Sequence, residues 1–530
     1  MPRMTDATNT RRLTELDHAH LWHPFTPMRQ WREREPCIIE RAEGFELIDT
    51  QGRRYIDGFS SLWCNVHGHR VPEIDAAIRE QLGRVAHSTM LGFASVPAIE
   101  LGARLVETAN MPAESMGPIG PMSPTGPMSE AQDNPSASLR LGPPLTKVFY
   151  SDAGATAVEV ALKMAAGRHY HRGERERTTF VSLFGAYHGD TFGAISVGFT
   201  ETFHAPYRGL TFPTVEFPAP DVCRMGGSHG SESRATGGTA LRAVSADWPS
   251  WDNPRREFTR DYALAALDRT LDEVGDRCAG VIIEPIMQGA AGMIEQPEGF
   301  LAGVAERVRS RGLLLIADAV AVGFGRTGTM FACEEEGVRP DILCLAKGIT
   351  GGYLPLAATL CTDEIAEAFE GEPGEGRTLY HGHTYTGNPL ACAAALASLD
   401  LFEKRGVLAN VRRLSEIMRT RLRDALADHP NVGDVRLRGV MCGIELVQRR
   451  DPWTPFNPAS LVGAAVCGAA RPQGLIIRPL GDVVILMPAP GMDQDTLERM
   501  LDAAIGAIRD FDFTGAGGVK HTPGASLQSA

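Results

Sequence analysis

Short apolar runs alternate with segments of helical spacing through the middle of the chain, and this alternation limits the fold more than any other feature. The runs 146–152 (TKVFYSD), 278–286 (CAGVIIEPI) and 313–320 (LLLIADAV) predict strands. The segments 155–173 and 299–312 repeat apolar residues with the period of an amphipathic helix. Strands that are apolar throughout are typical of a parallel sheet with helices on both faces. The sequence therefore predicts an α/β domain with a mostly parallel sheet.

The pattern changes at about Asn388. Two long helical segments, 389–406 and 410–430, are followed by short apolar runs such as MCGIELV, LIIRPL and DVVILMP, and a last helix is predicted over 493–511. Short strands mixed with long helices predict a smaller α+β domain. We therefore expect a large domain over 66–387 and a small C-terminal domain over 388–513.

The N-terminal segment 1–65 is expected to join the small domain. Residues 113–144 and 224–254 are rich in Pro, Gly and Ser and show no period, so they are predicted to be flexible insertions in the large domain. The tail 514–530 has the same composition and is predicted to be disordered.

Bulk composition excludes several classes of protein. The formal net charge of −13 argues against nucleic acid or an anionic membrane as a partner. The ten cysteines form no CxxC pair, which argues against a disulfide framework or a zinc module. No apolar run approaches the roughly 20 residues of a membrane span, and the first residues lack the apolar block of a signal peptide. These features predict a soluble cytoplasmic protein.

Chemically versatile residues follow several of the predicted strands. Lys347 follows DILCL, Asp318 ends LLLIAD, and Gly154 lies in the turn of YSDAGAT, before a helix. Tyr187 and His188 follow FVSLFGA. Because ligands of open α/β sheets bind outside the carboxyl ends of the strands, we expect these residues to converge on one rim of the sheet.

Each of these residues also has a purely structural interpretation. Lys347 could extend its ammonium to solvent, Asp318 could cap a helix, and the turn at Gly154 could be an ordinary helix start. Together they match a more specific chemistry. A lysine for a Schiff base, an acid for a pyridinium nitrogen and a helix N-terminus for a phosphate are the protein groups that pyridoxal phosphate requires.

Two further motifs resemble binding sites but are assigned other roles. GFGRTG (323–328) satisfies the dinucleotide pattern G-x-G-x-x-G, yet no amphipathic helix is predicted after it, so we expect a glycine loop. A nicotinamide-dependent dehydrogenase is therefore a remote alternative. His18, His20 and His23 lack cysteine or carboxylate partners in their motif HAHLWH, so capping and packing are expected rather than metal binding.

The motifs YHGDTFGAISVG, GFGRTG, DILCLAKG and HGHTYTGNPLACAAA resemble class III aminotransferases. The resemblance runs from about Leu16 to Phe511, apart from the two insertions. WHPFT, SSLW and IIRPLG are similar to the biotin-pathway branch of that family. The resemblance implies a fold-type I homodimer that binds pyridoxal 5′-phosphate. It also implies 8-amino-7-oxononanoate and S-adenosylmethionine as substrates, and no metal.

The resemblance also assigns roles near the cofactor. It implies that Lys347 forms the Schiff base and shuttles the proton, and that Asp318 keeps the pyridine nitrogen protonated. Tyr187 would stack on the ring, and the backbone of Gly154 and Ala155 would bind the phosphate.

Other residues match the parts of the family's site that face the substrate or the second subunit. His383 and Thr384 would reach the phosphate from the neighbouring subunit. Trp63, Gly382 and Arg478 match the substrate pocket, to which Tyr187 also belongs. The planar fork of Arg478 suits a carboxylate.

Six positions depart from the usual family pattern. Ala153 and Ala155 replace serines but keep the backbone donors, and the other four bear on the activity. Phe25 and Leu62, both in the substrate pocket, replace a tyrosine and, in some members, a tryptophan. Ala319 and Val322 stand where glutamate and threonine are usual. Phe25 and Leu62 leave open another ω-amine transaminase, with lysine, a polyamine or an ω-amino acid as donor. Ala319 and Val322 leave open a cofactor-binding relic with impaired catalysis.

Overall fold

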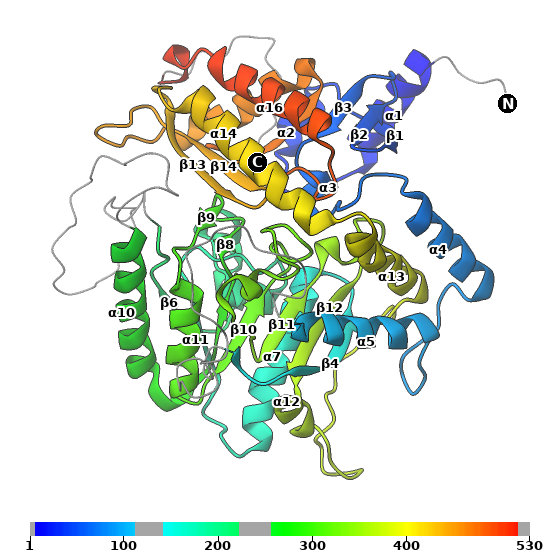
Figure 1. The fold of residues 1–530 in the computed structure, drawn as a ribbon, viewed down its shortest axis with the longest axis vertical. Coiled ribbons are helices and arrows are strands. Elements are labelled where there is room, and N and C mark those ends of the chain that lie inside the picture. Colours follow the sequence, from blue (N-terminus) through cyan, green and yellow to red (C-terminus); the bar gives the residue numbers. More distant parts are fainter. Residues whose placement is uncertain (1–5, 112–140, 222–255, 518–530) are drawn as a thin grey trace. The chain divides into compact units, whose positions relative to one another are not determined.

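The computed structural model describes residues 6–111, 141–221 and 256–517 (Figure 1). The chain divides into two compact units, which we call the large unit (Pro72–Val222 and Pro254–Arg412) and the small unit (Met1–Val71 and Arg413–Ala530, with Cys223–Asn253). Most of the first predicted insertion (113–140), all of the second (224–254) and the tail from residue 518 lie outside the described residues. The start of the expected tail, Thr514–Gly517, forms a 3₁₀ turn, η10.

The division between the units differs from the predicted domain boundaries. The helix α13 (Pro389–Lys404), expected to open the small domain, belongs to the large unit because it packs on α4 (Pro72–Arg84) and α5 (Val96–Asn110). The apolar pattern of α13 is equally consistent with the first helix of the small domain and with the last helix of the large domain. Sequence pattern alone therefore places this boundary poorly.

The large unit contains nine described strands and further helices. Its strands are β4 (Leu145–Ser151), β5 (Thr179–Leu183), β6 (Thr214–Phe217), β7 (Cys278–Ile283), β8 (Met287–Gln288), β9 (Ile294–Glu295), β10 (Leu314–Asp318), β11 (Ile342–Leu345) and β12 (Ala357–Thr362). Its remaining helices are α7 (Gly154–His171), α8 (Phe192–Val197), α9 (Glu201–His204), α10 (Arg256–Val274), α11 (Phe300–Ser310) and α12 (Asp363–Glu367). Short 3₁₀ turns are η3 (Ala205–Leu210), η5 (Gly275–Arg277), η6 (Ala332–Glu336) and η7 (Lys347–Thr350).

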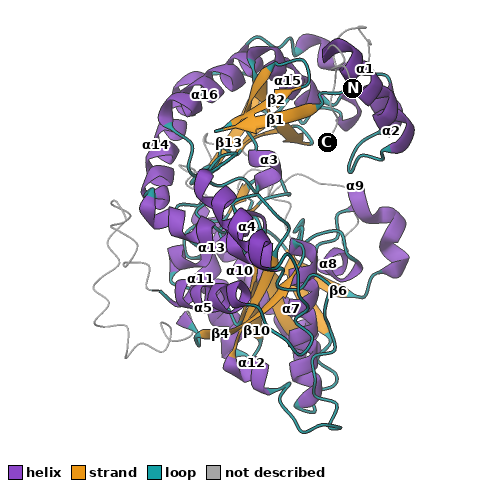
Figure 2. Ribbon diagram, turned by 90° about the vertical axis from the view of Figure 1, so that its right-hand side faces the viewer, coloured by secondary structure: helices purple, strands orange, loops and turns teal. Residues whose placement is uncertain are grey.

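Seven of these strands form one sheet in the order β4-β12-β11-β10-β7-β5-β6. The pairs β11–β10, β10–β7, β7–β5 and β5–β6 are parallel, whereas β12 is antiparallel to both of its neighbours. Figure 2 shows α7 on one face of this sheet and α5 and α11 on the other. The prediction of a mostly parallel sheet covered by helices is confirmed. The carboxyl ends of β4, β5, β7, β10 and β11 consequently share one edge.

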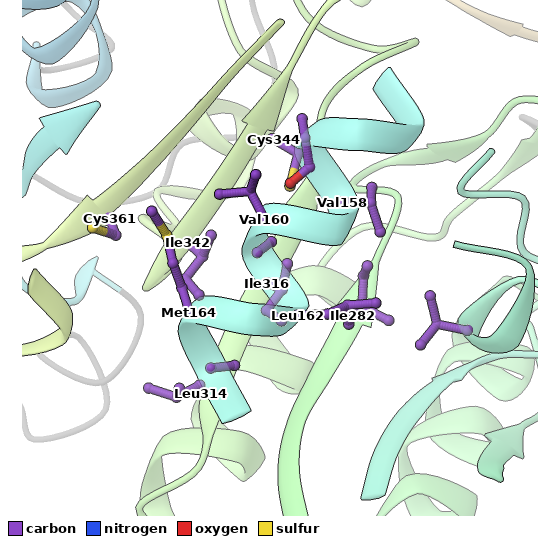
Figure 3. Packing of buried hydrophobic residues seen from close by; sticks show 14 of the residues in the cluster. Val158, Val160, Leu162, Met164, Ile282, Leu314, Ile316, Ile342, Cys344 and Cys361 are labelled. Carbon is purple, nitrogen blue, oxygen red and sulfur yellow. The ribbon is translucent and has the colours of Figure 1, made fainter. Parts of the chain in front are cut away.

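Helix α7 is held to the sheet by a continuous apolar core. Val158 and Leu162 of α7 lie against the layer of strands that includes Ile282 and Ile316 (Figure 3). These side chains are buried, and each contributes roughly 1.5–3 kcal/mol to stability when fully buried. Because β4 leads directly into α7, this packing fixes the N-terminus of α7 at the shared carboxyl edge of the sheet.

The small unit contains two four-stranded sheets. One has the order β1-β2-β3-β15 and the other β13-β14-β17-β16. The strands are β1 (Ile39–Glu43), β2 (Glu46–Asp49), β3 (Arg54–Asp57), β13 (Val432–Arg438), β14 (Met441–Leu446), β15 (Leu475–Ile476), β16 (Arg478–Leu480) and β17 (Val483–Leu486). The helices are α1 (Asp6–His20), α2 (Met28–Arg32), α3 (Ser60–Trp63), α15 (Val462–Ala470) and α16 (Gln494–Arg509), with 3₁₀ turns η8 (Pro458–Ser460) and η9 (Arg471–Gln473). The helix α14 (Val407–Leu426) contains the boundary between the units.

The predicted strand LIIRPL is divided between these two sheets. Its first part, β15, pairs with β3, and its second part, β16, pairs with β17. Arg478 therefore lies at the point where the chain passes from one sheet to the other. Within the described residues, no helix has the length and apolar character that a membrane span requires.

Candidate active site

The ends of β10 and β11 bring Asp318 and Lys347 to the same edge of the sheet. Asp318 is the last residue of β10 and is paired in register with Cys344 of β11. The amide of Ala319 donates a hydrogen bond to the carbonyl of Cys344 at 2.9 Å, which ties the two strand ends together. Lys347 follows at the first position of η7. The strand-end rule thus placed the two predicted catalytic residues on adjacent strands.

Lys347 has a strained backbone. Its φ of 44° lies in the left-handed region, which residues with a β-carbon rarely adopt and which costs on the order of 1–3 kcal/mol. The residue is half-buried and the three residues after it are buried. Strain of this kind persists where the surrounding structure fixes it and is concentrated at active sites. The backbone therefore sets the direction in which the amine leaves the sheet.

Asp318 is held by two hydrogen bonds. Its Oδ2 lies 2.7 Å from Nδ1 of His188, and its Oδ1 accepts a hydrogen bond from the amide of Val320 at 3.0 Å. Both Asp318 and His188 are buried. These contacts fix the plane of the carboxylate, as required of an acid that must meet a ring nitrogen in one orientation. His188, singled out in the sequence only by its position after a strand, is thereby a direct partner of Asp318.

Glu284 is a buried carboxyl group that sequence reasoning missed. It follows β7, and its oxygens accept hydrogen bonds from the amides of Gly289 (2.9 Å) and Tyr187 (3.3 Å). Burial raises the pKa of Glu284 to about 7; the charge of Asp318 adds to this shift, and the imidazole of His188 acts against it. Its place at the carboxyl end of a strand was the available signal. Glu284 ties the loop after β7 to the loop that carries Tyr187.

A substitution of Glu284 with glutamine should change how stability depends on pH. The folded protein holds the proton of Glu284 up to about pH 7, whereas an unfolded chain releases it near 4.5. The folded state therefore binds more protons between these values, and wild-type stability falls as the pH rises through this window. Glu284→Gln lacks this loss, which amounts to on the order of 3 kcal/mol by pH 8.

We expect the unfolding midpoint of the Glu284→Gln apoprotein to rise relative to wild type between pH 5 and pH 8. The glutamine amide would face backbone N–H donors, at a pH-independent cost of about 1–3 kcal/mol. The test therefore depends on how the difference between the two unfolding midpoints changes with pH, and not on its size at any one pH. Glu80→Gln, an exposed residue that pairs with Arg84, is the control and should give no slope. A constant difference for Glu284→Gln would contradict the raised pKa.

The turn before α7 is shaped for close approach. A β-carbon on Gly154 would lie 2.6 Å from Cγ1 of Val320, and one on Gly189 would lie 2.3 Å from Cβ of Ala155. Thr156 accepts a hydrogen bond from the amide of Ala153 at 3.0 Å, which closes the first turn of the helix. The amides at the start of α7 and its positive dipole end suit an anion such as a phosphate. Gly154 and Ala155 thus lie beside the loops that carry Asp318 and Tyr187.

Tyr187 is supported by residues that the sequence analysis did not identify. Its hydroxyl donates a hydrogen bond to Oδ2 of Asp190 at 2.8 Å, and its ring stacks on His204 with centroids 6.3 Å apart. Burial, with a contribution from Asp190, raises the pKa of Tyr187. The phenol therefore stays protonated at neutral pH. Asp190 follows the motif YHG directly, and His204 carries no sequence signal.

The loop that contains Gly382, His383 and Thr384 lies in the same unit. Nδ1 of His383 lies 2.8 Å from Oδ2 of Asp152, which precedes the turn at Gly154. Nζ of Lys163 lies 2.9 Å from Nδ1 of His381. Gly382 and Thr384 are exposed. The expected contribution of His383 and Thr384 to a neighbouring subunit stays a prediction.

The glycine motif GFGRTG forms a turn, as expected. A 3₁₀ helix, η6, follows it rather than an α-helix, so the geometry of a dinucleotide-binding turn is missing from this motif. Phe324 and Gly325 have left-handed φ values of 55° and 85°. Ala319 and Val322, which depart from the family pattern, precede this turn in the sequence, and both are fully buried.

The predicted substrate residues Phe25, Leu62, Trp63 and Arg478 belong to the small unit. Phe25 and Leu62 are exposed, Trp63 is buried, and burial lowers the pKa of Arg478, although the guanidinium remains charged at neutral pH. A cavity of about 160 Å³ adjoins Arg478. Its lining residues are Thr26, Pro27, Gln30, Trp31, Arg34, Cys467, Ile477, Arg478 and Pro479.

The structure corrects an expectation about the histidine motif HAHLWH, which lies next to one wall of this cavity. His23 does have a carboxylate partner, because its Nε2 lies 2.7 Å from Oδ2 of Asp17. Oδ1 of Asp17 accepts a hydrogen bond from the indole of Trp31 at 2.6 Å, and the rings of His23 and Trp31 lie 4.3 Å apart. Asp17 and His23 together therefore fix the position of Trp31, which lines the cavity. Within the described residues, no group of His, Cys, Asp and Glu is arranged to hold a metal ion.

The residues of the large unit fit pyridoxal phosphate. Asp318 presents a fixed, buried carboxylate, and the first turn of α7 offers backbone donors beside two close-packed glycines. Nε2 of His188 is buried and has no hydrogen-bond partner among the described residues. No other described protein group therefore continues the Asp318–His188 hydrogen bond on the far side of the imidazole. Lys347 provides an amine on the adjacent strand end. Asp318, the first turn of α7 and Lys347 thus match the pyridine nitrogen, the phosphate and the aldehyde of the cofactor, respectively.

Comparison with known proteins defines the class. The family model described as aminotransferase class-III matches residues 28–508, and the chain belongs to this family. It therefore has the fold of fold-type I transferases, is a transaminase, and uses pyridoxal 5′-phosphate as its cofactor. The predicted family, fold and cofactor are confirmed.

One relative and two solved structures are similar to this chain over most of its length. The chain is 47% identical to the adenosylmethionine-8-amino-7-oxononanoate aminotransferase of Nitratidesulfovibrio vulgaris, over 97% of this chain and 84% of the relative. The crystal structure of the enzyme of that name from Methanocaldococcus jannaschii has a TM-score of 0.79 and 38% identity, over 95% of this chain and 100% of the other. A PLP-bound amine transaminase from an uncultivated Pseudomonas species has a TM-score of 0.77 and 32% identity, over 92% and 98%.

Proposed function

We propose that the chain transfers an amino group from S-adenosylmethionine to 8-amino-7-oxononanoate and thereby makes 7,8-diaminononanoate for biotin synthesis. The observation that carries the reaction type is the placement of Lys347 beside Asp318 at the carboxyl edge of the sheet. The names of the relatives and the cavity at Arg478 support the substrates.

Pyridoxal phosphate, when bound, carries the amino group between the two substrates and accepts electrons from the reacting carbon. The protein's own groups then have separate tasks. Asp318 holds a proton at the pyridine nitrogen, in the plane fixed by His188. The first turn of α7, at Gly154 and Ala155, binds the phosphate. Tyr187 covers the ring, and the amine of Lys347 moves the proton at the substrate carbon.

Arg478 is proposed to bind the carboxylate of the keto acid. Its guanidinium is half-buried and can bind a carboxylate in bidentate fashion. A second arginine, Arg34, lines the same cavity and adds positive charge, while Trp31 and Ile477 add apolar surface. A cavity of about 160 Å³ admits the end of a chain rather than a whole S-adenosylmethionine molecule. This chemistry suits a long keto acid with one terminal carboxylate.

The test is the absorbance spectrum of the purified holoprotein before and after addition of S-adenosylmethionine. We expect the cofactor to change to its aminated form, and subsequent 8-amino-7-oxononanoate to reverse the change with release of 7,8-diaminononanoate. No diaminononanoate from any donor would contradict the proposed acceptor. A spectrum that no amine changes would instead indicate a cofactor-binding relic, as Ala319 and Val322 leave open.

A second candidate concerns only the donor. Phe25 has no hydroxyl with which to hydrogen-bond a donor, and Leu62 has no aromatic ring on which a donor could stack. An ω-amine such as lysine, a polyamine or an ω-amino acid would depend less on these contacts than S-adenosylmethionine. A donor screen under identical conditions separates the two: a spectrum that changes with lysine but not with S-adenosylmethionine would favour the second candidate.

We further propose that the protein is a homodimer in which His383 and Thr384 contact the phosphate of the neighbouring subunit and Gly382 its substrate. The support is apolar exposure near this loop: Tyr380, Tyr385, Leu91 and Phe93 are 78%, 59%, 79% and 70% exposed. Side chains of this size are rarely left exposed in a group on a monomer. Light scattering should give the mass of a dimer, and a monomer with full activity would contradict the proposal.

A further inference from the structure

The segment Ser60–Trp63 of the small unit adopts a left-handed helical turn. The φ values of Ser60, Ser61, Leu62 and Trp63 are 53°, 49°, 68° and 70°. In such a turn the β-carbon of an L-residue crowds the next carbonyl oxygen, so left-handed residues other than glycine usually occur singly. A run of four, with no glycine, requires contacts that hold it.

Asp57 supplies the contacts at the start of the turn. This buried residue ends β3; its Oδ1 accepts a hydrogen bond from the amide of Ser61 at 2.8 Å, and its Oδ2 accepts one from the Ser61 hydroxyl at 2.7 Å. Nε2 of His69 lies 3.1 Å from the same Oδ2. The carboxylate therefore caps the turn and is itself oriented by the imidazole.

The backbone on either side is also fixed. The Ser60 hydroxyl donates a hydrogen bond to the carbonyl of Met487 at 2.6 Å, and the amide of Met487 donates one to the carbonyl of Gly58 at 2.8 Å. The amides of Trp63 and Cys64 bond to carbonyls four residues earlier, at 2.9 and 3.0 Å. The turn is thus a defined structure and not a loosely placed loop.

Ser60 and Trp63 of this turn are buried, whereas the side chain of Leu62 is not. Leu62, with the second largest φ of the four, is 53% exposed. A glycine at this position would adopt the same backbone without the crowding. A strained conformation that places a large apolar side chain in solvent is better explained by recognition than by stability.

We propose that Asp57 is a positioning residue for substrate recognition: its carboxylate holds Ser60–Trp63 left-handed, so that Leu62 and Trp63 face the substrate in one orientation before it binds. This inference rests on the proposed function, which places both side chains in the substrate pocket. A right-handed turn of the same residues would direct the two side chains elsewhere. Leu62 and Trp63 present hydrocarbon and an aromatic ring, so the ligand they select is the apolar chain of the keto acid.

The experiment compares Asp57→Ala with a matched control, Asp49→Ala. Asp49 is an equally buried aspartate at the end of the adjacent strand β2, where it caps a different turn by accepting hydrogen bonds from the amides of Gln51 (3.0 Å) and Arg53 (2.9 Å). Amide hydrogen exchange of the holoprotein should show that residues 63–65 are protected in wild type and Asp49→Ala and unprotected in Asp57→Ala. This measurement requires no activity.

Steady-state kinetics of the same variants provide a second measurement. We expect Asp57→Ala to raise the KM for 8-amino-7-oxononanoate at least tenfold, with kcat and the KM of the donor changed less than threefold. Asp57→Asn keeps one oxygen for the Ser61 amide and should recover much of the loss. A KM increase no larger than that of Asp49→Ala, or a turn that stays protected, would overturn the proposal.

Leu62→Gly keeps the proposal testable if Asp57→Ala does not fold. Glycine relieves the strain, so the variant should unfold at the same or a higher temperature while its KM for the keto acid rises. An unchanged KM would make the turn merely structural and overturn the inference. If wild-type protein makes no diaminononanoate, the proposed function fails, whereas hydrogen exchange still decides whether Asp57 holds the turn.

Discussion

Replacing Lys347 with alanine is expected to abolish transamination and the covalent attachment of the cofactor. No other described lysine lies at the carboxyl edge of the sheet on a strand adjacent to Asp318. Removing a nucleophile that also moves the proton should lower kcat by at least about 10⁴-fold, since proton transfer alone contributes about 10²–10⁴-fold. Single-turnover absorbance measurements with saturating S-adenosylmethionine would measure the loss.

The chain offers a clear control because it contains only five lysines: Lys147, Lys163, Lys347, Lys404 and Lys520. Lys147 lies on β4, is 56% exposed and pairs with Asp363, so Lys147→Ala should keep full activity. Borohydride reduction of the wild-type holoprotein should leave the cofactor on the peptide that contains Lys347, as read by mass spectrometry. A label on another lysine, or substantial turnover by Lys347→Ala, would contradict the assignment.

Much of the large unit could be predicted because its signals are local. Apolar strands, helix periods and the rule that ligands bind at the carboxyl ends of strands were sufficient to place Lys347, Asp318 and Gly154 on one edge. The partners of these residues were less accessible. His188 lies in the loop after β5 and Asp318 ends β10, far apart in the sequence, and no local pattern indicates that one carboxylate oxygen meets Nδ1 of the imidazole.

The small unit shows a different limit. LIIRPL has the composition of one strand, yet it divides between two sheets, because pairing partners, not propensity, decide where a strand ends. SSLW contains no glycine, so nothing in its composition indicates a left-handed turn. Hydrogen bonds to the carboxylate of Asp57 and to the carbonyl of Met487, both outside the motif, help to hold that conformation. Contacts of this kind are tertiary and cannot be read from the segment itself.

Asp318→Asn is expected to keep the fold and the Lys347 linkage but to lower kcat by at least about 10²-fold, the usual effect of removing a group that stabilises developing charge. An asparagine amide cannot hold a proton at the pyridine nitrogen, and its N–H₂ group would replace the acceptor that meets His188 or Val320. The variant should therefore bind pyridoxal phosphate more weakly, while its reduced adduct still maps to Lys347.

Asp341→Asn provides the comparison that separates chemistry from stability. Asp341 is also buried and also accepts a backbone hydrogen bond, from Leu315 at 2.8 Å, but it precedes β11 and so lies at the opposite edge of the sheet from Asp318. Asp341→Asn should lower the unfolding temperature without changing cofactor affinity or kcat. Equal losses of activity in both variants would mean that Asp318 acts through the stability of the sheet. A loss confined to Asp318→Asn would mean that its fixed carboxylate acts on the cofactor itself.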